Sequence, residues 1–197
     1  MPLIFQYGSN CDATRLNSKD RLDGAAIDHG PAETIEEYEV SFAVWSKGNA
    51  CAASNVASAT GTGHHAWGVL YEVPADRIRG RKRTDGKKTM EDIEGSQYEE
   101  MEKPIRVRNS AGAEVEATTF VVKPSAERKG VLRNSNSGRI VLWTSAKYVG
   151  HIISGLRAHG VPEGYVQHIV DIALDANRRV GETSQDLLIE SLRHTRL

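Results

Sequence analysis

The chain has 197 residues, of which 39% are hydrophobic and 26% charged, with a formal net charge of −1 at pH 7. This length predicts one domain with a sizeable core, and the composition excludes global disorder. A net charge so close to zero excludes an overall field that would select nucleic acid or a membrane surface. We find no signal-peptide pattern and no run of about 18 apolar residues. Two cysteines favour a reducing compartment, so a cytoplasmic protein is expected.

Strand-like segments dominate the first two thirds of the chain. An apolar run over residues 3–7 stops at the turn-forming sequence Gly8-Ser9-Asn10, and the polar stretch 12–30 predicts irregular structure with at most one helical turn. Alternating or strongly apolar runs then predict further strands, over 35–45, 50–57, 66–73, 105–107 and 115–122. The glycine-rich link 60–63 resembles a hairpin loop, and the last two runs resemble a second hairpin.

The last third of the chain changes to a helical period. Apolar residues recur every four positions from Tyr148 to Leu156, which predicts a helix that ends at Gly160. Pro162 suits the first turn of a second helix, and residues 185–193 are expected to form a third. Because the strands precede the helices without βαβ alternation, we expect an α+β fold with a mostly antiparallel sheet or barrel.

Several common catalytic and metal sites are absent from the sequence. It contains no Walker phosphate loop, no Cys-x-x-Cys pair and no His-Glu-x-x-His zinc helix. His64 and His65 are adjacent, but neighbours on a strand point to opposite faces, so we expect surface or loop-end positions rather than a shared metal. Cys11 has no partner base nearby in the sequence and is interpreted as a buried small residue, while a disulfide with Cys51 stays open.

A basic segment over residues 77–88, with the sequence RIRGRKRTDGKK, is the one marked shift in composition. Such a run could contact phosphates, or it could be a solvated loop that deters aggregation. It has no interleaved aromatic residues on which bases could stack. We therefore favour an exposed loop and expect no nucleic acid as partner.

Three local features could carry chemistry. Tyr7-Gly8-Ser9-Asn10 can turn backbone N–H groups toward a common point, because glycine permits the dihedral angles that such a nest needs. Glu94 directly precedes Gly95 and lies shortly before Tyr98. Tyr148 opens the first C-terminal helix. Taken singly, these features are more typical of a turn, a solvated acid and packed tyrosines than of a functional site.

Together and in this order, the three features resemble the gamma-glutamylcyclotransferase family. That pattern runs from Tyr-Gly-Ser-Asn through Trp-Gly-Val-x-Tyr and Leu-Asp-x-x-Glu-Gly to Gly-Leu-Pro-x-x-Tyr. The corresponding segments of this chain are 7–10, 67–71, 90–95 and 160–165, so the resemblance covers residues 3–170. The chain departs from the pattern at Cys11, where leucine is usual, at Met90-Glu91 in place of Leu-Asp, and in a longer segment 77–88.

The resemblance implies a small mixed, mostly antiparallel β-barrel with flanking C-terminal helices. This domain would cover residues 1–180, and 181–197 would form a helical tail. The family releases 5-oxoproline from gamma-glutamyl amines or peptides without a metal or cofactor, so the implied partner is a small-molecule gamma-glutamyl substrate. Glutathione, a gamma-glutamyl amino acid, a gamma-glutamylamine and a glutamyl-capped secondary metabolite all present the same gamma-glutamyl group and are not distinguished.

In this reaction, the residues of the pattern would have different roles. Glu94 would take the proton of the substrate's alpha-amine and return one to the leaving amine, which requires a carboxyl with a raised pKa. The loop, with Gly8, Ser9 and Asn10, would supply hydrogen-bond donors to the oxyanion. Three tyrosines are expected to orient the glutamyl head: Tyr7, Tyr98 and Tyr148.

Two rival functions use other parts of the same sequence. A non-catalytic module could hold an acidic metabolite in the same pocket, although an anion binder gains little from an added carboxylate. An adaptor could use the basic segment 77–88 or the tail 181–197 to bind a partner macromolecule.

Overall fold

A computed structural model describes residues 1–80, 86–126, 132–133 and 140–195 of the chain. Its centre is a five-stranded antiparallel sheet of order β1-β5-β2-β7-β8. The strands of this sheet are β1 (Leu3–Gln6), β5 (Trp67–Glu72), β2 (Ile27–Thr34), β7 (Ile105–Asn109) and β8 (Glu114–Ala117). β1 and β5 are apolar on both faces because both faces are covered, and Phe5 and Leu70 are almost fully buried.

The sheet curls so that the segment after β8 reaches the opposite edge strand, β1. Beyond β8, the N–H of Thr118 donates to Leu3 O at 2.8 Å, and the N–H of Phe5 donates to Thr118 O at 2.8 Å. The free edge of β1 is therefore covered by the segment that follows β8. The predicted fold class is confirmed: an α+β protein with a curled, mostly antiparallel half-barrel and C-terminal helices.

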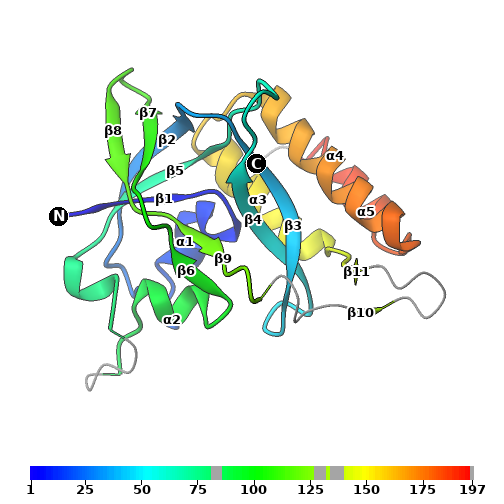
Figure 1. The fold of residues 1–197 in the computed structure, drawn as a ribbon, viewed down its shortest axis with the longest axis horizontal. Helices are drawn as coiled ribbons and strands as arrows, with labels where there is room; N and C mark the ends of the chain where they lie inside the picture. Colours follow the sequence, from blue (N-terminus) through cyan, green and yellow to red (C-terminus); the bar gives the residue numbers. More distant parts are fainter. Residues whose placement is uncertain (81–85, 127–131, 134–139, 196–197) are drawn as a thin grey trace.

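Three further antiparallel pairs complete the β-structure. β3 (Tyr38–Ser46) and β4 (Cys51–Ser58) form a long hairpin, which lies between the curled sheet and the C-terminal helices in Figure 1. The remaining pairs are β6 (Tyr98–Glu100) with β9 (Phe120–Val122) and β10 (Leu132–Arg133) with β11 (Ile140–Val141).

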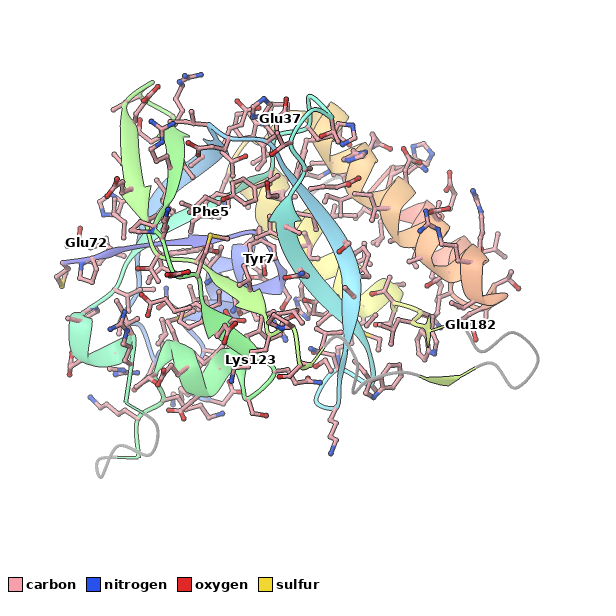
Figure 2. The ribbon with its side chains drawn as sticks, in the orientation of Figure 1. Phe5, Tyr7, Glu37, Glu72, Lys123 and Glu182 are labelled. Atoms are coloured by element: carbon pink, nitrogen blue, oxygen red, sulfur yellow. The ribbon has the colours of Figure 1, made fainter. Side chains whose placement is uncertain are left out.

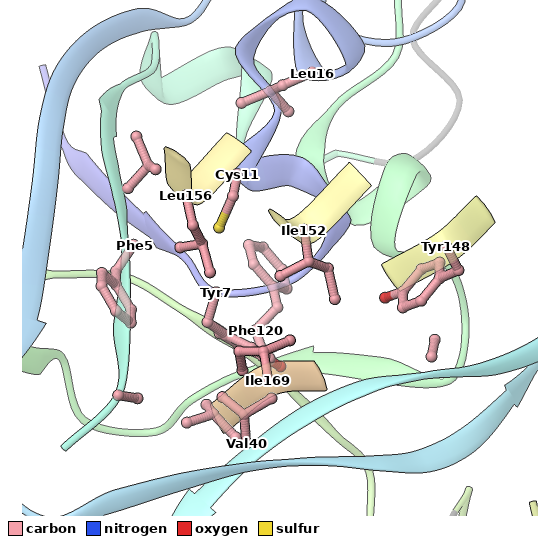
Figure 3. Close-up of a cluster of buried hydrophobic side chains, with 14 of the residues drawn as sticks. Phe5, Tyr7, Cys11, Leu16, Val40, Phe120, Tyr148, Ile152, Leu156 and Ile169 are labelled. Carbon is pink, nitrogen blue, oxygen red and sulfur yellow. The ribbon is translucent and has the colours of Figure 1, made fainter. Parts of the chain in front are cut away.

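Short helices follow the strands, and longer ones end the chain. The short ones are η1 (Ser9–Cys11), α1 (Ala13–Leu16), η2 (Ala75–Arg77) and α2 (Met90–Glu94). The C-terminal ones are α3 (Ala146–Ala158), α4 (Glu163–Val180) and α5 (Asp186–Ser191). The Ser145 hydroxyl accepts a hydrogen bond from Tyr148 N and caps α3, whose buried Ile152 and Leu156 pack near Cys11 (Figure 3). Among the described residues, no helix combines the length and apolarity of a membrane span.

Two sequence-based interpretations of the fold were wrong. Strand β2 begins inside the stretch 12–30 that was predicted to be irregular, because its first residues are exposed and a bulge between Asp28 and Gly30 breaks the alternation. The link 60–63 does not close a hairpin, since β4 pairs with β3 whereas β5 pairs with β1 and β2. Turn residues mark where a strand ends but do not reveal its partner.

Candidate active site

The loop after β1 turns sharply into η1 and forms one wall of a cavity. Gly8 precedes η1, and Ser9 and Asn10 are buried. A side chain at Gly8 would bring a Cβ atom to 2.5 Å from Ser54 Oγ, so any larger residue would displace the Ser54 hydroxyl from its place beside the loop. The first N–H groups of a helix have no partner within the helix, so the start of η1 offers donors to a ligand at this wall. Figure 2 shows Tyr7 near the middle of the molecule, at the end of β1.

The acid that the sequence analysis singled out lies against this loop. Glu94 is the last residue of α2, a helix that starts with a capping box between Thr89 and Asp92. Its Oε1 accepts a hydrogen bond from Asn10 Nδ2 at 2.9 Å. Asn10 Oδ1 in turn accepts one from Arg21 Nη1 at 2.7 Å. The fold thus brings the loop and the acid together, and Arg21 fixes the orientation of the amide between them.

Partial burial changes the acidity of Glu94. Loss of hydration raises the pKa of Glu94 to about 7, against the opposite effects of hydrogen bonds from Asn10 and Gln6 and of the Arg21 charge. A carboxyl group with this pKa exchanges protons readily near neutral pH. This is the property that proton transfer would require of the residue.

The three tyrosines differ in their contacts. Tyr98 Oη donates to Ser54 O at 2.6 Å, and Tyr148 Oη accepts from Ser54 N at 3.1 Å. Burial raises the pKa of both phenols, so they stay neutral hydrogen-bonding groups. Tyr7 Oη donates to Phe120 O at 2.6 Å, which ties β1 to β9. In Figure 3 the Tyr148 hydroxyl points inward from α3.

All seven residues predicted for the site line one small cavity of about 30 Å³. The cavity has space for a group about the size of a water molecule. Its other walls come from residues that were not predicted: Gln6, Ser54 and Phe120. The sequence contained a signal for Ser54, because Ser54 and Asn55 interrupt an otherwise apolar run in β4. The structure shows that both residues are buried. Buried polar residues inside a strand indicate a built hydrogen-bonding site.

A larger cleft of about 860 Å³ adjoins the small cavity and shares Glu94 and Tyr148 with it. Most of the charged residues that line it are basic: Arg15, Arg21, Lys47 and Lys147. The acidic residues in its lining are Asp20 and Glu94. Burial and repulsion from the Arg15 charge lower the pKa of Arg21, which lines the same cleft. In the part of the chain that the structure describes, none of the four cations has an ion pair. The cleft is therefore a positive region in a chain whose net charge is −1.

Cys11 belongs to the core and not to the site. Its Sγ donates to Gln6 O at 3.0 Å, and burial raises the pKa of the thiol far from neutrality. Cys51 is buried as well, and no disulfide joins the two cysteines. The interpretation of Cys11 as a buried small residue is consistent with these contacts.

The basic segment is only partly described, since residues 81–85 lie outside the described ranges. Arg77 is buried and donates to Leu22 O and Lys88 O, both at 2.9 Å. Arg79 forms an exposed ion pair with Glu100. The described part of this segment therefore contains structural contacts as well as solvated charge.

Comparisons with known proteins identify the family. The model of the AIG2-like family matches residues 65–169, more than half of the chain, and the protein belongs to this family. The matched range includes Glu94, Tyr98 and Tyr148, whereas the loop at residues 7–10 lies outside it. A search of curated proteins finds no match.

Solved structures share the fold at low sequence identity. A gamma-glutamyl cyclotransferase superposes with a TM-score of 0.63 at 13% identity, over 98% of this chain and 99% of the other. An uncharacterized protein from Homo sapiens gives 0.62 at 16% identity, with 85% of each chain covered. YkqA from Bacillus subtilis gives 0.57 at 17% identity over 85% of this chain, which spans only 54% of YkqA. The predicted family resemblance is confirmed.

Proposed function

We propose that this protein is a gamma-glutamyl cyclotransferase that releases 5-oxoproline from a gamma-glutamyl compound, with Glu94 as general acid and base. The observation that carries the proposal is the contact between Asn10 and Glu94, which places a carboxyl group of pKa about 7 beside the donor loop. Membership of the AIG2-like family and the shared fold support the same reaction.

The proposed reaction needs one proton acceptor and one set of donors. Glu94 takes a proton from the substrate's alpha-ammonium group, whose pKa of about 7.7–8.0 leaves it largely protonated at neutral pH. The freed amine attacks the gamma-carbonyl carbon and closes a five-membered ring, which is favoured because nucleophile and carbonyl belong to one molecule. Glu94 then returns the proton to the departing nitrogen as the old C–N bond breaks. The ring nitrogen gives up its second extra proton, which the free amine takes up to leave as an ammonium ion. The products are 5-oxoproline and the free amine.

The two cavities suit the two parts of such a substrate. The inner cavity has space for an oxygen-sized group, so it would hold the carbonyl oxygen that becomes the oxyanion. Donors from the loop at Gly8 and Ser9 would stabilise its charge, and one such donor is typically worth about 10²–10³ in rate. The remainder of the substrate would lie in the outer cleft, where Glu94 borders both spaces.

The test of this function is turnover of gamma-glutamyl compounds by the purified protein. We expect 5-oxoproline and the free amine to form in equal amounts from at least one member of a panel of gamma-glutamyl peptides, amino acids and amines. A non-catalytic module that holds an acidic metabolite would instead show thermal stabilisation by the ligand with no product. That result would overturn the proposed function.

The charge of the outer cleft indicates the substrate class within this function. Guanidinium groups bind carboxylates through paired hydrogen bonds, and Arg15 and Lys147 have no ion pair of their own among the described residues. We therefore propose that the leaving amine carries an acidic group, as in a gamma-glutamyl amino acid or peptide. A simple alkylamine offers nothing to these cations.

Removing these cations is expected to change substrate preference. For Arg15→Gln and Lys147→Gln, kcat/KM should fall roughly 10-fold or more with a carboxylate-bearing leaving group and less than about 3-fold with its amide. The ratio between the two substrates cancels any effect on Glu94. Lys19→Gln, an exposed lysine outside the cleft, is the control. Equal losses on both substrates would show that the cations bind the glutamyl head instead.

A further inference from the structure

A second group of side chains, far from Glu94 in the sequence, has the composition of a metal site. We propose that Glu39, His64 and His168 bind one divalent transition-metal ion of the Zn²⁺ class. One potential ligand atom from each residue lies within 4.8 Å of those from the other two. His64 Nδ1 is 3.7 Å from Glu39 Oε1, and the imidazole rings of His64 and His168 have their centroids 5.5 Å apart. This inference does not depend on the cyclotransferase proposal.

The three ligands come from three different segments whose backbones are held in place. Glu39 lies on β3, where it pairs with Ala57 of β4. His64 lies in the link from β4 to β5, and its carbonyl accepts a hydrogen bond from Tyr38 N at 3.0 Å. His168 lies in the middle of α4 beside the buried Ile169. Only side-chain rotation is needed to bring the three groups onto one ion.

The ligand set and spacing suit zinc. Two imidazoles and one carboxylate are among its common ligands, with Zn–N and Zn–O distances of about 2.0–2.2 Å. Tetrahedral coordination at these lengths puts ligand atoms about 3.3–3.5 Å apart, so the present separations of up to 4.8 Å must shorten by up to about 1.5 Å. Glu39 and His64 are about half exposed, so their rotamers are free to adjust. Three protein ligands leave a fourth position for water.

His64 and His65 are adjacent in the sequence, but these two residues do not share a site. His65 Nδ1 lies 3.0 Å from Thr34 O, within the β-structure. The partner of His64 is His168, which is distant in the sequence and becomes a neighbour only when α4 packs against β3. A metal here would join the link between β4 and β5 to α4. Its expected effect is stabilisation of the fold.

The test is metal titration of tag-free full-length protein after treatment with a chelator. Isothermal titration with Zn²⁺ should show one site per chain, and about 100-fold excess over Kd should raise Tm by about 5–10 °C. Titration with Co²⁺ should give the visible absorption bands of a tetrahedral site. Binding should weaken at acidic pH, where protons compete for the imidazoles.

Single substitutions assign the site. His64→Ala and His168→Ala should each weaken Zn²⁺ binding about 100-fold or more, while the matched control His65→Ala should leave Kd within about 3-fold. Both substituted positions are at least partly exposed, so folding should survive, and circular dichroism will check it. The proposal is overturned by the absence of saturable Zn²⁺ binding, or by a site that persists in both variants. A negative result here leaves gamma-glutamyl turnover untouched, and the converse holds as well.

Discussion

Replacement of Glu94 by glutamine is expected to lower 5-oxoproline formation by about 10²–10⁴-fold, the usual contribution of general acid–base catalysis. Glutamine keeps the shape of the side chain and an oxygen that can accept the hydrogen bond from Asn10. It cannot accept the proton of the alpha-ammonium group. The loss should appear in kcat as well as in kcat/KM, because proton transfer occurs in the bound complex. Steady-state assay of 5-oxoproline measures both.

The same variant provides its own folding control through the pH dependence of stability. The pKa of Glu94 is about 7 in the folded protein, above its ordinary value of 4.5. Its contribution to stability is therefore complete below about pH 4.5 and is lost as the pH rises toward 7. Glu94→Gln lacks this loss, so its free energy of unfolding relative to wild type should increase between about pH 5 and pH 8, by up to roughly 3 kcal/mol. Melting temperatures of the two proteins across this pH range will measure the difference.

A matched acid distinguishes a local role from a general effect of charge. Glu99 lies on β6, close to Glu94 in the sequence, but its side chain is exposed and lines neither cavity. Glu99→Gln should retain activity within about 2-fold of wild type, as expected of a surface substitution. Full activity in Glu94→Gln would remove the carboxylate from the mechanism.

A substitution at Gly155, in the second half of α3, is expected to disrupt the site by displacing the backbone of η1. A Cβ atom at this position would lie 2.3 Å from the carbonyl carbon of Cys11 and 2.4 Å from Asp12 N. Both are backbone atoms, so they cannot rotate out of the way, and either α3 or η1 must shift. η1 carries Ser9 and Asn10, so the shift would move the donor loop away from Glu94.

The expected cost of Gly155→Ala is roughly 3 kcal/mol in free energy of unfolding, at the upper end for overpacking because backbone must move. In a chain of this size that lowers Tm by about 6–12 °C. Gly150→Ala in the same helix is the control, since its Cβ would make an ordinary contact 3.8 Å from Leu192 Cδ2. That change should be neutral or stabilising by up to about 1 kcal/mol, because alanine favours helix. Equal melting temperatures for the two variants would show that α3 does not press on η1.

The sequence predicts the local elements of this fold better than their pairing. Residues 3–7 and 66–73 are apolar enough to be recognised as strands, and their pairing as β1 and β5 agrees with that composition. The start of β2 gives no such signal because it is exposed and bulged. The role of the link 60–63 depends on tertiary contacts that a local sequence pattern does not contain.

For the candidate site as well, the sequence indicates individual residues better than the contacts between them. Nothing in the local sequence indicates that Asn10 and Glu94 are in contact, and it was the family resemblance that placed them in one pocket. The support around them comes from residues scattered along the chain, such as Ser54 on β4 and Arg21 after α1. Likewise, His64 acquires His168 as a neighbour only through the packing of α4. Contacts between distant segments are a product of the fold.

The most direct test of the proposed reaction follows the atoms of the ring. A gamma-glutamyl substrate labelled with ¹⁵N at its alpha-amine is incubated with the protein in H₂¹⁸O, and the products are analysed by mass spectrometry. Internal attack predicts 5-oxoproline that retains ¹⁵N and contains no ¹⁸O, released together with the free amine. Formation of glutamate with ¹⁸O in its gamma-carboxylate would show hydrolysis by water and would contradict the cyclisation mechanism.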